Sequence, residues 1–178
     1  MKKRTLLLGL ASGIAIAIFM NIMVAYCNPE HATGNMLLGY TAMILAFSVI
    51  FVAIKKERDE NGGVITFGRA FRTALLITFI TSTIYVIAWL VDYHVFMPDF
   101  MDKYAATSIK AAQAAHLSAQ QLKEKIDNIN QMKEMYRSTF WVIVFTYAEI
   151  FPVGLVISLI AALILKRNGD KEQTVPAN

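Results

Sequence analysis

Residues 140–165 of the chain have the sequence FWVIVFTYAEIFPVGLVISLIAALIL, in which Glu149 is the sole charged residue. The hydrocarbon core of a lipid bilayer is about 30 Å thick, and a helix needs roughly 20 apolar residues to cross it. Lipid offers no hydrogen-bond partners to backbone N–H and C=O groups, so a segment that crosses it must be helical. Residues 140–165 are therefore predicted to form a transmembrane helix.

Three further stretches of this kind come earlier in the chain. Residues 6–27 and residues 36–54 contain no charged residue, and residues 74–97 contain none before Asp92. Apolar and polar residues do not alternate in these stretches, as they would in the strands of a closed β-barrel. The sequence predicts an all-α integral membrane protein with four transmembrane helices, forming a single membrane domain over residues 1–178.

The first stretch has an alternative interpretation as a cleaved signal peptide. Residues 2–4 are basic, as the residues before the apolar core of a signal peptide are. The apolar region is longer than a usual signal core, however, and the bulky Tyr26 stands before Cys27, where a lipoprotein cleavage box has a small residue. We expect residues 6–27 to remain in the protein as a span.

The overall composition agrees with a membrane protein. Of the 178 residues, 56% are hydrophobic and 17% are charged, whereas soluble domains carry about 25% charged residues. This balance excludes a disordered chain and a collagen-like fibre, and it disfavours an ordinary soluble enzyme. Cys27 is the sole cysteine, so the chain can form neither an intrachain disulfide nor a thiolate metal cluster.

The distribution of basic residues predicts an orientation. Lysine and arginine are frequent before the first span, between the second and third spans and after the fourth, whereas residues 28–35 contain neither. The positive-inside rule then places both termini and the second connection in the cytoplasm. We expect a multi-pass protein of a bacterial inner membrane, with residues 166–178 as a flexible cytoplasmic tail. The net charge of +4 then requires no nucleic-acid partner.

Small residues are predicted to let the spans approach each other closely. Gly9, Gly13 and Ala17 recur at four-residue spacing on one face of the first span. This face could pack within one bundle, or it could contact a second copy of the chain or another membrane protein, since each case needs the same residues. In the fourth span Pro152 has no backbone N–H, so we expect a kink there, eased by Gly154.

The second connection is predicted to end where a helix begins. Thr66 fits the N-cap position of a helix that starts at Phe67. Arg69 and Arg72 flank an apolar face of that helix. One interpretation is an interfacial segment with its rings in the lipid boundary and its guanidinium groups at the headgroups. The alternative is that the third span starts at Phe67 and protrudes.

Residues 98–139 are predicted to form a helical insertion outside the membrane. The segment is rich in alanine, glutamine and lysine, which favour helix. Ser118 and Gln121 match a capping box, so we expect two helices, at residues 101–116 and 119–136. The pair could be a solvated hairpin closed on itself, or it could be a docking surface for a partner outside the membrane.

Polar residues within the predicted spans form a candidate site. Counting along the helices places Asn21, Asp92 and Glu149 near the outer edge of the hydrocarbon, with Tyr85 at a similar depth. A charge inside a bilayer costs at least about 2.5–3.5 kcal/mol. Three interpretations stay open: Glu149 fixes helix packing by hydrogen bonds, the residues bind a cation, a proton or an amine, or Asp92 simply reaches water beside the headgroups.

The sequence contains no catalytic or cofactor-binding pattern. A glycine-rich phosphate loop and a His-x-x-x-His pair are both absent. His31, His94 and His116 are far apart, and two histidines without a third ligand are weak evidence for zinc. The enzyme hypothesis rests solely on a possible pairing of Cys27, as the nucleophile, with a histidine. We expect a non-enzymatic protein without a metal or a cofactor.

Several short segments resemble those of a known family. They are GVITFGRAF at residues 63–71, Ile84-Tyr85 and Trp89 in the third span, Pro98-Asp99-Phe100 after it, and EIFPVGL at residues 149–155. In these segments and in the order of its spans, the chain resembles the uncharacterised bacterial membrane proteins grouped as domain-of-unknown-function family 4199, over about residues 5–167. The resemblance implies four spans, and it implies no activity and no catalytic residue.

Two functions are expected from these observations. The first is a non-enzymatic structural or accessory component of the membrane that acts through a partner. The alternative is a small transporter or sensor with an outward-facing polar site formed by Asn21, Asp92 and Glu149. Convergence of the two carboxylates in one solvent-connected cavity would favour the second function.

Overall fold

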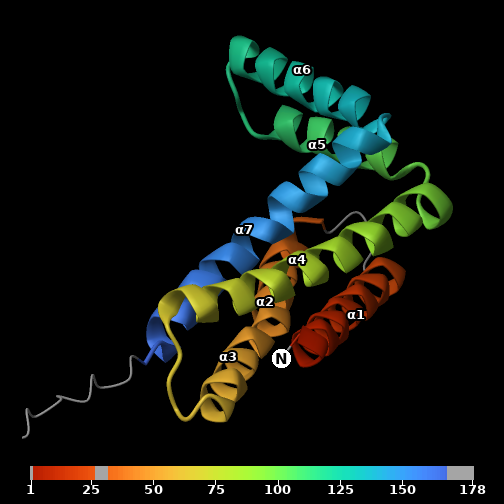
Figure 1. The fold of residues 1–178 in the computed structure, drawn as a ribbon. Helices are drawn as coiled ribbons and strands as arrows, with labels where there is room; N and C mark the ends of the chain where they lie inside the picture. The colour runs from red at the N-terminus through yellow and green to blue at the C-terminus, as the bar shows by residue number, and fades with distance from the viewer. Residues whose placement is uncertain (1, 27–31, 168–178) are drawn as a thin grey trace, which may run out of the picture.

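The structure, a computed structural model, describes residues 2–26 and 32–167 (Figure 1). Its helical elements in chain order are α1 (Lys2–Tyr26), α2 (Ala32–Phe47), α3 (Val49–Glu60), α4 (Phe67–Val91), the π-helical segment η2 (Asp92–Phe96), α5 (Phe100–Ala114), α6 (Ala119–Tyr136) and α7 (Thr139–Leu165). In the described ranges the β pairing is limited to an isolated bridge between Ile65 and Arg167. The predicted all-α fold is confirmed.

Four helical segments are long and apolar enough to cross a membrane. They are Lys3–Met23, Leu37–Glu60, Phe67–Phe96 and Thr139–Leu165. The prediction of four candidate membrane-spanning helices is confirmed. The second segment consists of α2 and α3, which follow each other with the single turn residue Ser48 between them. The Ser48 hydroxyl donates to the Leu45 carbonyl at 2.6 Å.

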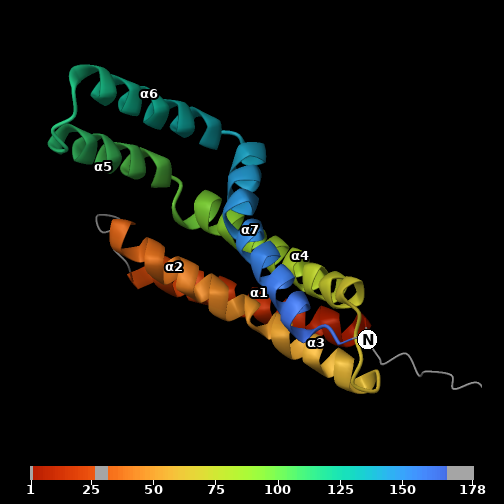
Figure 2. The same ribbon diagram turned by 90° about the vertical axis from the view of Figure 1, so that its left-hand side faces the viewer.

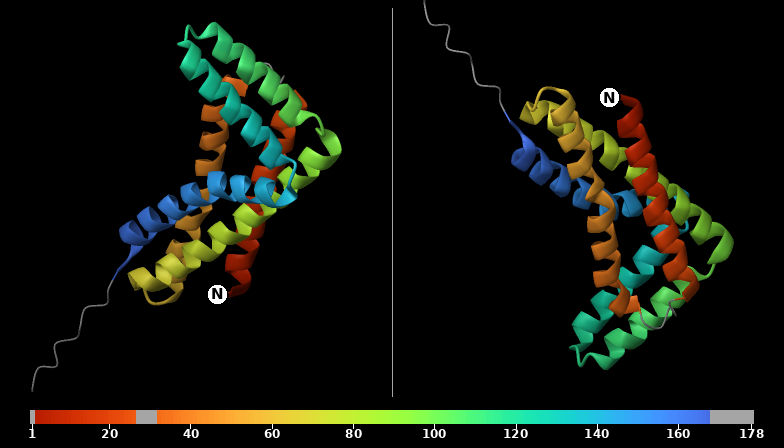
Figure 3. Two further views of the ribbon diagram at one scale, coloured as in Figure 1. Left: turned by 90° about the horizontal axis from the view of Figure 1, so that it is seen from above. Right: turned by 90° about the horizontal axis from the view of Figure 1, so that it is seen from below.

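Helix α4 lies at the centre of the bundle. It contacts α1 on one side and α7 on the other, and α3 contacts both α4 and α7 (Figures 1 and 2). The start of α1, the α3–α4 connection and the end of α7 lie together at what we call the terminal end. The hairpin of α5 and α6 lies at the opposite end, called here the hairpin end (Figure 3). Its position outside the membrane stays a prediction.

The start of α4 corrects the interfacial-segment interpretation. Helix α4 runs without a break from Phe67 to Val91, so the third span begins at Phe67, as the alternative predicted. Phe67 and Phe71 stack with their ring centroids 5.7 Å apart and pack against the hydrophobic core, and Ala70 is fully buried. This face therefore packs against the hydrophobic core of the protein.

Two glycine residues allow the close approach of α1 and α4. A Cβ added at Gly13 of α1 would lie 2.5 Å from Cδ1 of Ile84 in α4, and one added at Gly9 would lie 3.1 Å from Cβ of Ile80. Ala17, the third residue of the predicted small-residue face, is half-buried. Gly9 and Gly13 thus pack against α4 of the same chain.

Gly154 has a packing role that the sequence analysis did not predict. A Cβ at this position of α7 would lie 2.5 Å from Cγ2 of Thr78 and 2.7 Å from Cζ of Phe47. Helix α7 is assigned as helical through Pro152, and the kink expected there stays a prediction. The absence of a side chain at residue 154 lets α7 touch both α2 and α4.

Hydroxyl groups connect the buried faces of the spans. The Thr78 and Ser158 hydroxyls lie 2.9 Å apart between α4 and α7. The Thr81 hydroxyl donates to the Gly9 carbonyl of α1 at 3.3 Å. The Ser12 hydroxyl of α1 donates to the Ala46 carbonyl of α2 at 2.6 Å. These bonds give the polar groups partners inside an apolar bundle, where an unpaired group would be costly.

The two helices expected at residues 101–116 and 119–136 correspond to α5, which ends at Ala114, and to α6. Ser118 and Gln121 form both bonds of the capping box at the start of α6. Helix α5 contacts α6, and the Lys133 ammonium of α6 lies 2.5 Å from the Asp102 carboxylate of α5. The turn at Arg137 and Ser138 separates α6 from α7. The hairpin is thus closed on itself, and α6 does not run into the fourth span.

Candidate functional site

A cavity of about 400 Å³ lies between the hairpin and the bundle, at the hairpin end. Residues from four helices line it: Tyr85 and Trp89 of α4, Phe100, Met101 and Tyr104 of α5, Met132 and Tyr136 of α6, and Thr146 and Glu149 of α7. Its volume falls within the range of about 300–1,000 Å³ that is usual for small-molecule sites. The cavity is the first candidate site.

Glu149 brings the one carboxylate into this cavity. Its side chain is exposed, and it forms no hydrogen bond or ion pair with any residue in the described part of the chain. The neighbouring Thr146 hydroxyl is used elsewhere, because it donates to the Val142 carbonyl at 2.7 Å. The interpretation in which Glu149 fixes helix packing by hydrogen bonds therefore finds no such bond among the described residues.

Aromatic rings form most of the cavity wall. We call this set the aromatic wall: Tyr85, Trp89, Phe100, Tyr104 and Tyr136. Trp89 meets Phe100 edge-on with ring centroids 5.2 Å apart, and Phe100 stacks on Tyr104 at 6.2 Å. Such contacts fix the ring planes. The wall therefore brings aromatic rings from α4, α5 and α6 to the same cavity as the Glu149 carboxylate of α7.

The Tyr136 phenol stays neutral in this environment. Burial raises the pKa of Tyr136 above its ordinary value, and the nearby Glu149 carboxylate raises it further. The phenol thus keeps its proton at neutral pH and cannot add a second negative charge beside Glu149. Its backbone is also fixed, because the Tyr93 hydroxyl donates to the Tyr136 carbonyl at 3.1 Å.

The structure brings together two of the four predicted site residues and separates the others. Tyr85 and Glu149 line the cavity, whereas Asn21 and Asp92 do not. Asn21 is exposed, and its side-chain amide donates to the carbonyl of Ala17, one turn earlier in α1. The site therefore contains fewer of the predicted span residues than expected, and it also contains residues of the hairpin.

Asp92 is buried at the start of η2. Asp92 is 2% exposed, and its Oδ2 atom has no hydrogen-bond partner among the described residues. Its backbone carbonyl accepts the Met97 N–H at 2.8 Å, which ends the π-helical segment. Asp92 does not reach water beside the headgroups, so that interpretation is wrong.

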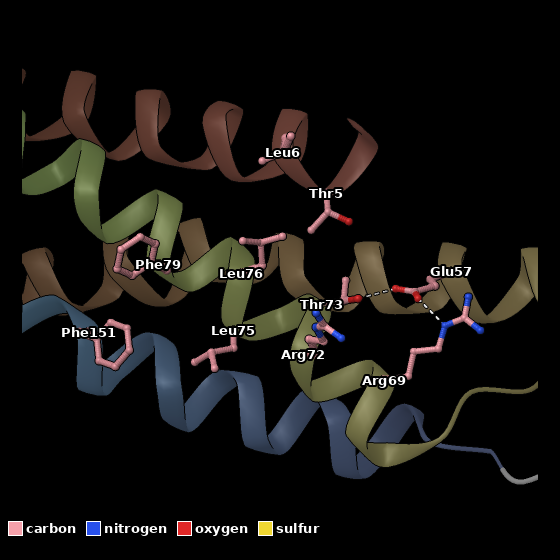
Figure 4. A pocket seen from close by; sticks show the side chains of 10 residues that line it. All are labelled: Thr5, Leu6, Glu57, Arg69, Arg72, Thr73, Leu75, Leu76, Phe79 and Phe151. Atoms are coloured by element: carbon pink, nitrogen blue, oxygen red, sulfur yellow. Dashed lines mark hydrogen bonds and ion pairs between the residues drawn. The ribbon is translucent and has the colours of Figure 1, made fainter. Parts of the chain in front are cut away.

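A second cluster of polar residues lies at the terminal end (Figure 4). Glu57 of α3 is 5% exposed, and its two carboxylate oxygens have different partners on α4. Arg69 Nε donates to Oε1 at 2.8 Å, and the Thr73 hydroxyl donates to Oε2 at 2.5 Å. Arg69 also donates to the Asn61 side-chain carbonyl at 3.1 Å. This Glu57 brace ties α3 to α4.

The Glu57 brace corrects the expectation for Arg69. The guanidinium was expected to reach lipid headgroups, and it instead pairs with a buried carboxylate. Glu57 does not stand out in the sequence, because Lys55 and Lys56 precede it and Arg58 follows it in a charge-rich segment. Its burial is visible only once α4 folds back against α3.

An apolar groove of about 830 Å³ lies beside the Glu57 brace. Figure 4 shows Leu6 of α1 and Phe151 of α7 on its two sides and residues of α4 between them. Leu76 and Phe79 of α4 are exposed in it. Arg72 also lines the groove and has no hydrogen bond or ion pair with a described residue. The apolar side chains fit contact with lipid acyl chains.

No catalytic group of histidine and cysteine is present among the described residues. Cys27 and His31 lie outside the described residues. His94 Nε2 lies 3.1 Å from the Thr139 hydroxyl and connects η2 to the start of α7. In residues 2–26 and 32–167, no group of three or more histidine, cysteine, aspartate or glutamate side chains is placed to hold a metal ion.

Comparison with known proteins identifies a family and no activity. Residues 7–167 match the family model described as "Protein of unknown function (DUF4199)". This range covers most of the 178 residues, and it includes all four candidate spans and the hairpin except for the first residues of α1. No curated protein and no solved structure matches the chain.

Proposed function

The chain belongs to the DUF4199 family of proteins of unknown function, and from this premise we propose a non-enzymatic role for it as an accessory component of the membrane. In this role it holds a rigid helical hairpin at one membrane surface, where a partner can bind. It is a multi-pass protein of the cytoplasmic membrane of a bacterium. The four long apolar helices support the membrane location.

One observation carries the proposal: several polar groups of the spans form hydrogen bonds between helices. The Thr78–Ser158 contact joins α4 to α7, Thr81 joins α4 to α1, and the Glu57 brace joins α3 to α4. A bundle held in this way supports an attached element more readily than it supplies free catalytic groups. The attached element is the hairpin.

The hairpin has a surface suited to a partner outside the membrane. Helix α6 exposes most of its residues, including Lys125 and Asn128, while Ile129 is buried. Its polar face is thus free within the described structure. We infer that recognition uses polar contacts on this face of α6.

The orientation follows from the charges at the terminal end. This end carries Arg4, Lys55, Lys56, Arg58, Arg69, Arg72, Lys166 and Arg167. Basic residues beside spans stay on the cytoplasmic side. The terminal end is therefore cytoplasmic in our proposal, and residues 98–139 lie outside.

Cysteine labelling tests the orientation. The native Cys27 is replaced by serine, and single cysteines replace Lys125 of the hairpin or Asp59 near the α3–α4 connection. In intact cells or sealed spheroplasts, a membrane-impermeant maleimide should label Lys125→Cys and should label Asp59→Cys only after permeabilisation. The reverse pattern would show that the hairpin is cytoplasmic.

Photo-crosslinking tests the accessory role. A photoreactive amino acid replaces Lys125 or Asn128 on α6, and in the matched control it replaces Val156, which is 53% exposed on α7. In native membranes both hairpin positions should capture the same protein, and the Val156 position should capture lipid. A product of twice the chain mass would identify a second copy. Lipid alone at all three positions would contradict the proposal.

The transporter alternative is not favoured. It required Asn21, Asp92 and Glu149 to form one polar site, and the cavity contains Glu149 alone of these three. The carboxylates of Asp92 and Glu149 do not share a described cavity.

A further inference from the structure

The cavity at the hairpin end has a composition that selects the chemistry of its occupant. Its charged residue is Glu149, and its other polar side-chain groups are hydroxyls and the indole N–H of Trp89. An anionic ligand would be repelled by the carboxylate, because no basic side chain lines the cavity. A neutral ligand would cover the carboxylate and leave its charge uncompensated, which is costly. A positively charged ligand is the one class that compensates Glu149.

A metal ion does not suit this cavity. Hard cations such as Ca²⁺ bind about six to eight oxygen atoms, and Mg²⁺ requires an octahedral set. The cavity supplies one carboxylate, and most of the rest of its surface is aromatic or methionine side chain. Its volume of about 400 Å³ also exceeds what a bare ion fills. The occupant is therefore larger and carries its charge on an organic group.

The aromatic wall supplies the complementary surface. A ring face attracts a cation within about 6 Å of its centroid, and the attraction grows when water is excluded. The Trp89–Phe100–Tyr104 contacts hold three rings in fixed planes on α4 and α5. Tyr136 adds a neutral ring from α6, since burial and then Glu149 raise its pKa. A cavity that combines several aromatic rings with one carboxylate is suited to an alkylammonium group.

We propose that this cavity binds an organic ammonium group, which pairs with Glu149 and packs against the aromatic wall. The proposal goes beyond the accessory role and does not depend on it. The ammonium group could belong to the ethanolamine or choline headgroup of a membrane lipid, or to a free amine that enters from outside. Both sources present the same chemistry to the cavity.

Trp89 provides the measurement. The chain contains two tryptophans, and Trp141 does not line the cavity. In the full chain with Trp141→Phe, Trp89 is therefore the sole tryptophan and reports on the aromatic wall. The protein is placed in nanodiscs of phosphatidylglycerol, which contains no ammonium group, and choline is titrated while the Trp89 emission is recorded. Dimethylbutanol, the uncharged carbon isostere of choline, is titrated in parallel.

We expect choline to change the Trp89 emission in a saturable way, and dimethylbutanol to need a concentration at least about tenfold higher. Glu149→Gln should weaken choline binding by about tenfold or more. The matched control is Glu134→Gln, which removes an exposed acid on α6 that pairs with Arg137 at 3.0 Å. Equal affinity for the two probes, or an unchanged affinity in Glu149→Gln, would overturn the proposal.

A second pair of variants covers the case in which Glu149→Gln fails to fold. Tyr104 is 38% exposed on α5 and belongs to the aromatic wall. Tyr104→Phe keeps the ring and should keep the affinity for choline, whereas Tyr104→Leu should weaken it several-fold. Equal binding by both variants would contradict an aromatic cage.

Lipid composition distinguishes the two sources of the ammonium group. If the headgroup is the natural occupant, adding phosphatidylethanolamine to the nanodiscs should shift the Trp89 emission and weaken choline binding by competition. If a free amine is the occupant, phosphatidylethanolamine should have no effect while choline still binds. No response to choline and none to phosphatidylethanolamine would overturn the proposal.

Discussion

Gly154 of α7 lies so close to Phe47 of α2 that a Cβ at residue 154 would come within 2.7 Å of Phe47 Cζ. Thr78 of α4 closes the same space from the other side, at 2.5 Å. All three residues lie on the buried faces of their helices, and Phe47 and Thr78 are 0% exposed. The meeting point of α2, α4 and α7 therefore has no room for a methyl group.

The first prediction concerns this meeting point. Gly154→Ala should lower the free energy of unfolding in detergent by about 1–3 kcal/mol, because an added methyl group forces Phe47 or Thr78 to move. Gly68→Ala is the matched control, since a Cβ there meets nothing within 4 Å and alanine favours helix by about 0.5–1 kcal/mol. Equal stability of Gly154→Ala and the parent chain would show that α7 can shift without cost.

The second prediction compares the loss of stability on replacing each of two glycines of α1 by alanine. A Cβ at Gly13 would approach Ile84 Cβ to 2.9 Å, whereas one at Gly9 would stay 3.1 Å or more from Ile80. Gly13→Ala should therefore destabilise the bundle more than Gly9→Ala does, by about 1 kcal/mol. Thermal unfolding of the two variants in the same detergent measures the difference. The opposite order would argue that α1 packs against α4 in another register.

The third prediction concerns the Glu57 brace. Arg69→Met should lower the free energy of unfolding by about 2–3 kcal/mol, because it leaves the Glu57 carboxylate buried without its cation. This is below the range for a fully buried pair, since the Arg69 side chain is 38% exposed and solvent screens part of the attraction.

Arg58→Met is the control for the brace. Its guanidinium lies 3.7 Å from the carboxylate of the exposed Asp59, and such a pair contributes about 0–1 kcal/mol. Chemical unfolding of both variants, followed by circular dichroism, provides the comparison. Losses of the same size in the two variants would mean that Glu57 does not depend on Arg69.

The fourth prediction is a pH dependence at the cavity. Burial and the Glu149 charge both raise the pKa of Tyr136, so this phenol should ionise at a higher pH than free tyrosine, whose pKa is about 10. Glu149→Gln removes the second cause and should lower the pKa of Tyr136, though not to the value of free tyrosine, because burial remains.

Ultraviolet titration checks this prediction. The contribution of Tyr136 is the difference between each chain and the same chain with Tyr136→Phe. An unchanged or raised pKa of Tyr136 in Glu149→Gln would show that the Glu149 carboxylate does not face the phenol. It would also weaken the argument that the two residues share one cavity.

The membrane-crossing elements could be predicted from the sequence because lipid imposes a strong and local requirement. A run such as residues 140–165 has one stable conformation in hydrocarbon, whatever its neighbours are. The capping box of Ser118 and Gln121 is likewise local, and it fixes the start of α6 where it was expected. The α2–α3 break at Ser48 carries no glycine or proline and was not predicted.

The candidate sites depend on contacts that are distant in sequence, and these were predicted only in part. Tyr85 and Glu149 were found because polar residues in a span are conspicuous. The contributions of Phe100, Tyr104 and Tyr136 were missed, since they require the hairpin to fold back over α4 and α7. Depth along a helix is readable from sequence, but the direction of a side chain around the helix is not. For this reason Asn21 and Asp92 were grouped with Glu149, although they do not line its cavity.

The backbone bridge between Ile65 and Arg167 sets a limit on shortening the chain. Ile65 is 1% exposed, its N–H donates to the Arg167 carbonyl at 2.9 Å, and its own carbonyl accepts the Arg167 N–H at 2.8 Å. Removing Arg167 would leave two main-chain groups of a buried residue without protein partners. A truncated version intended for crystallisation should therefore retain Arg167.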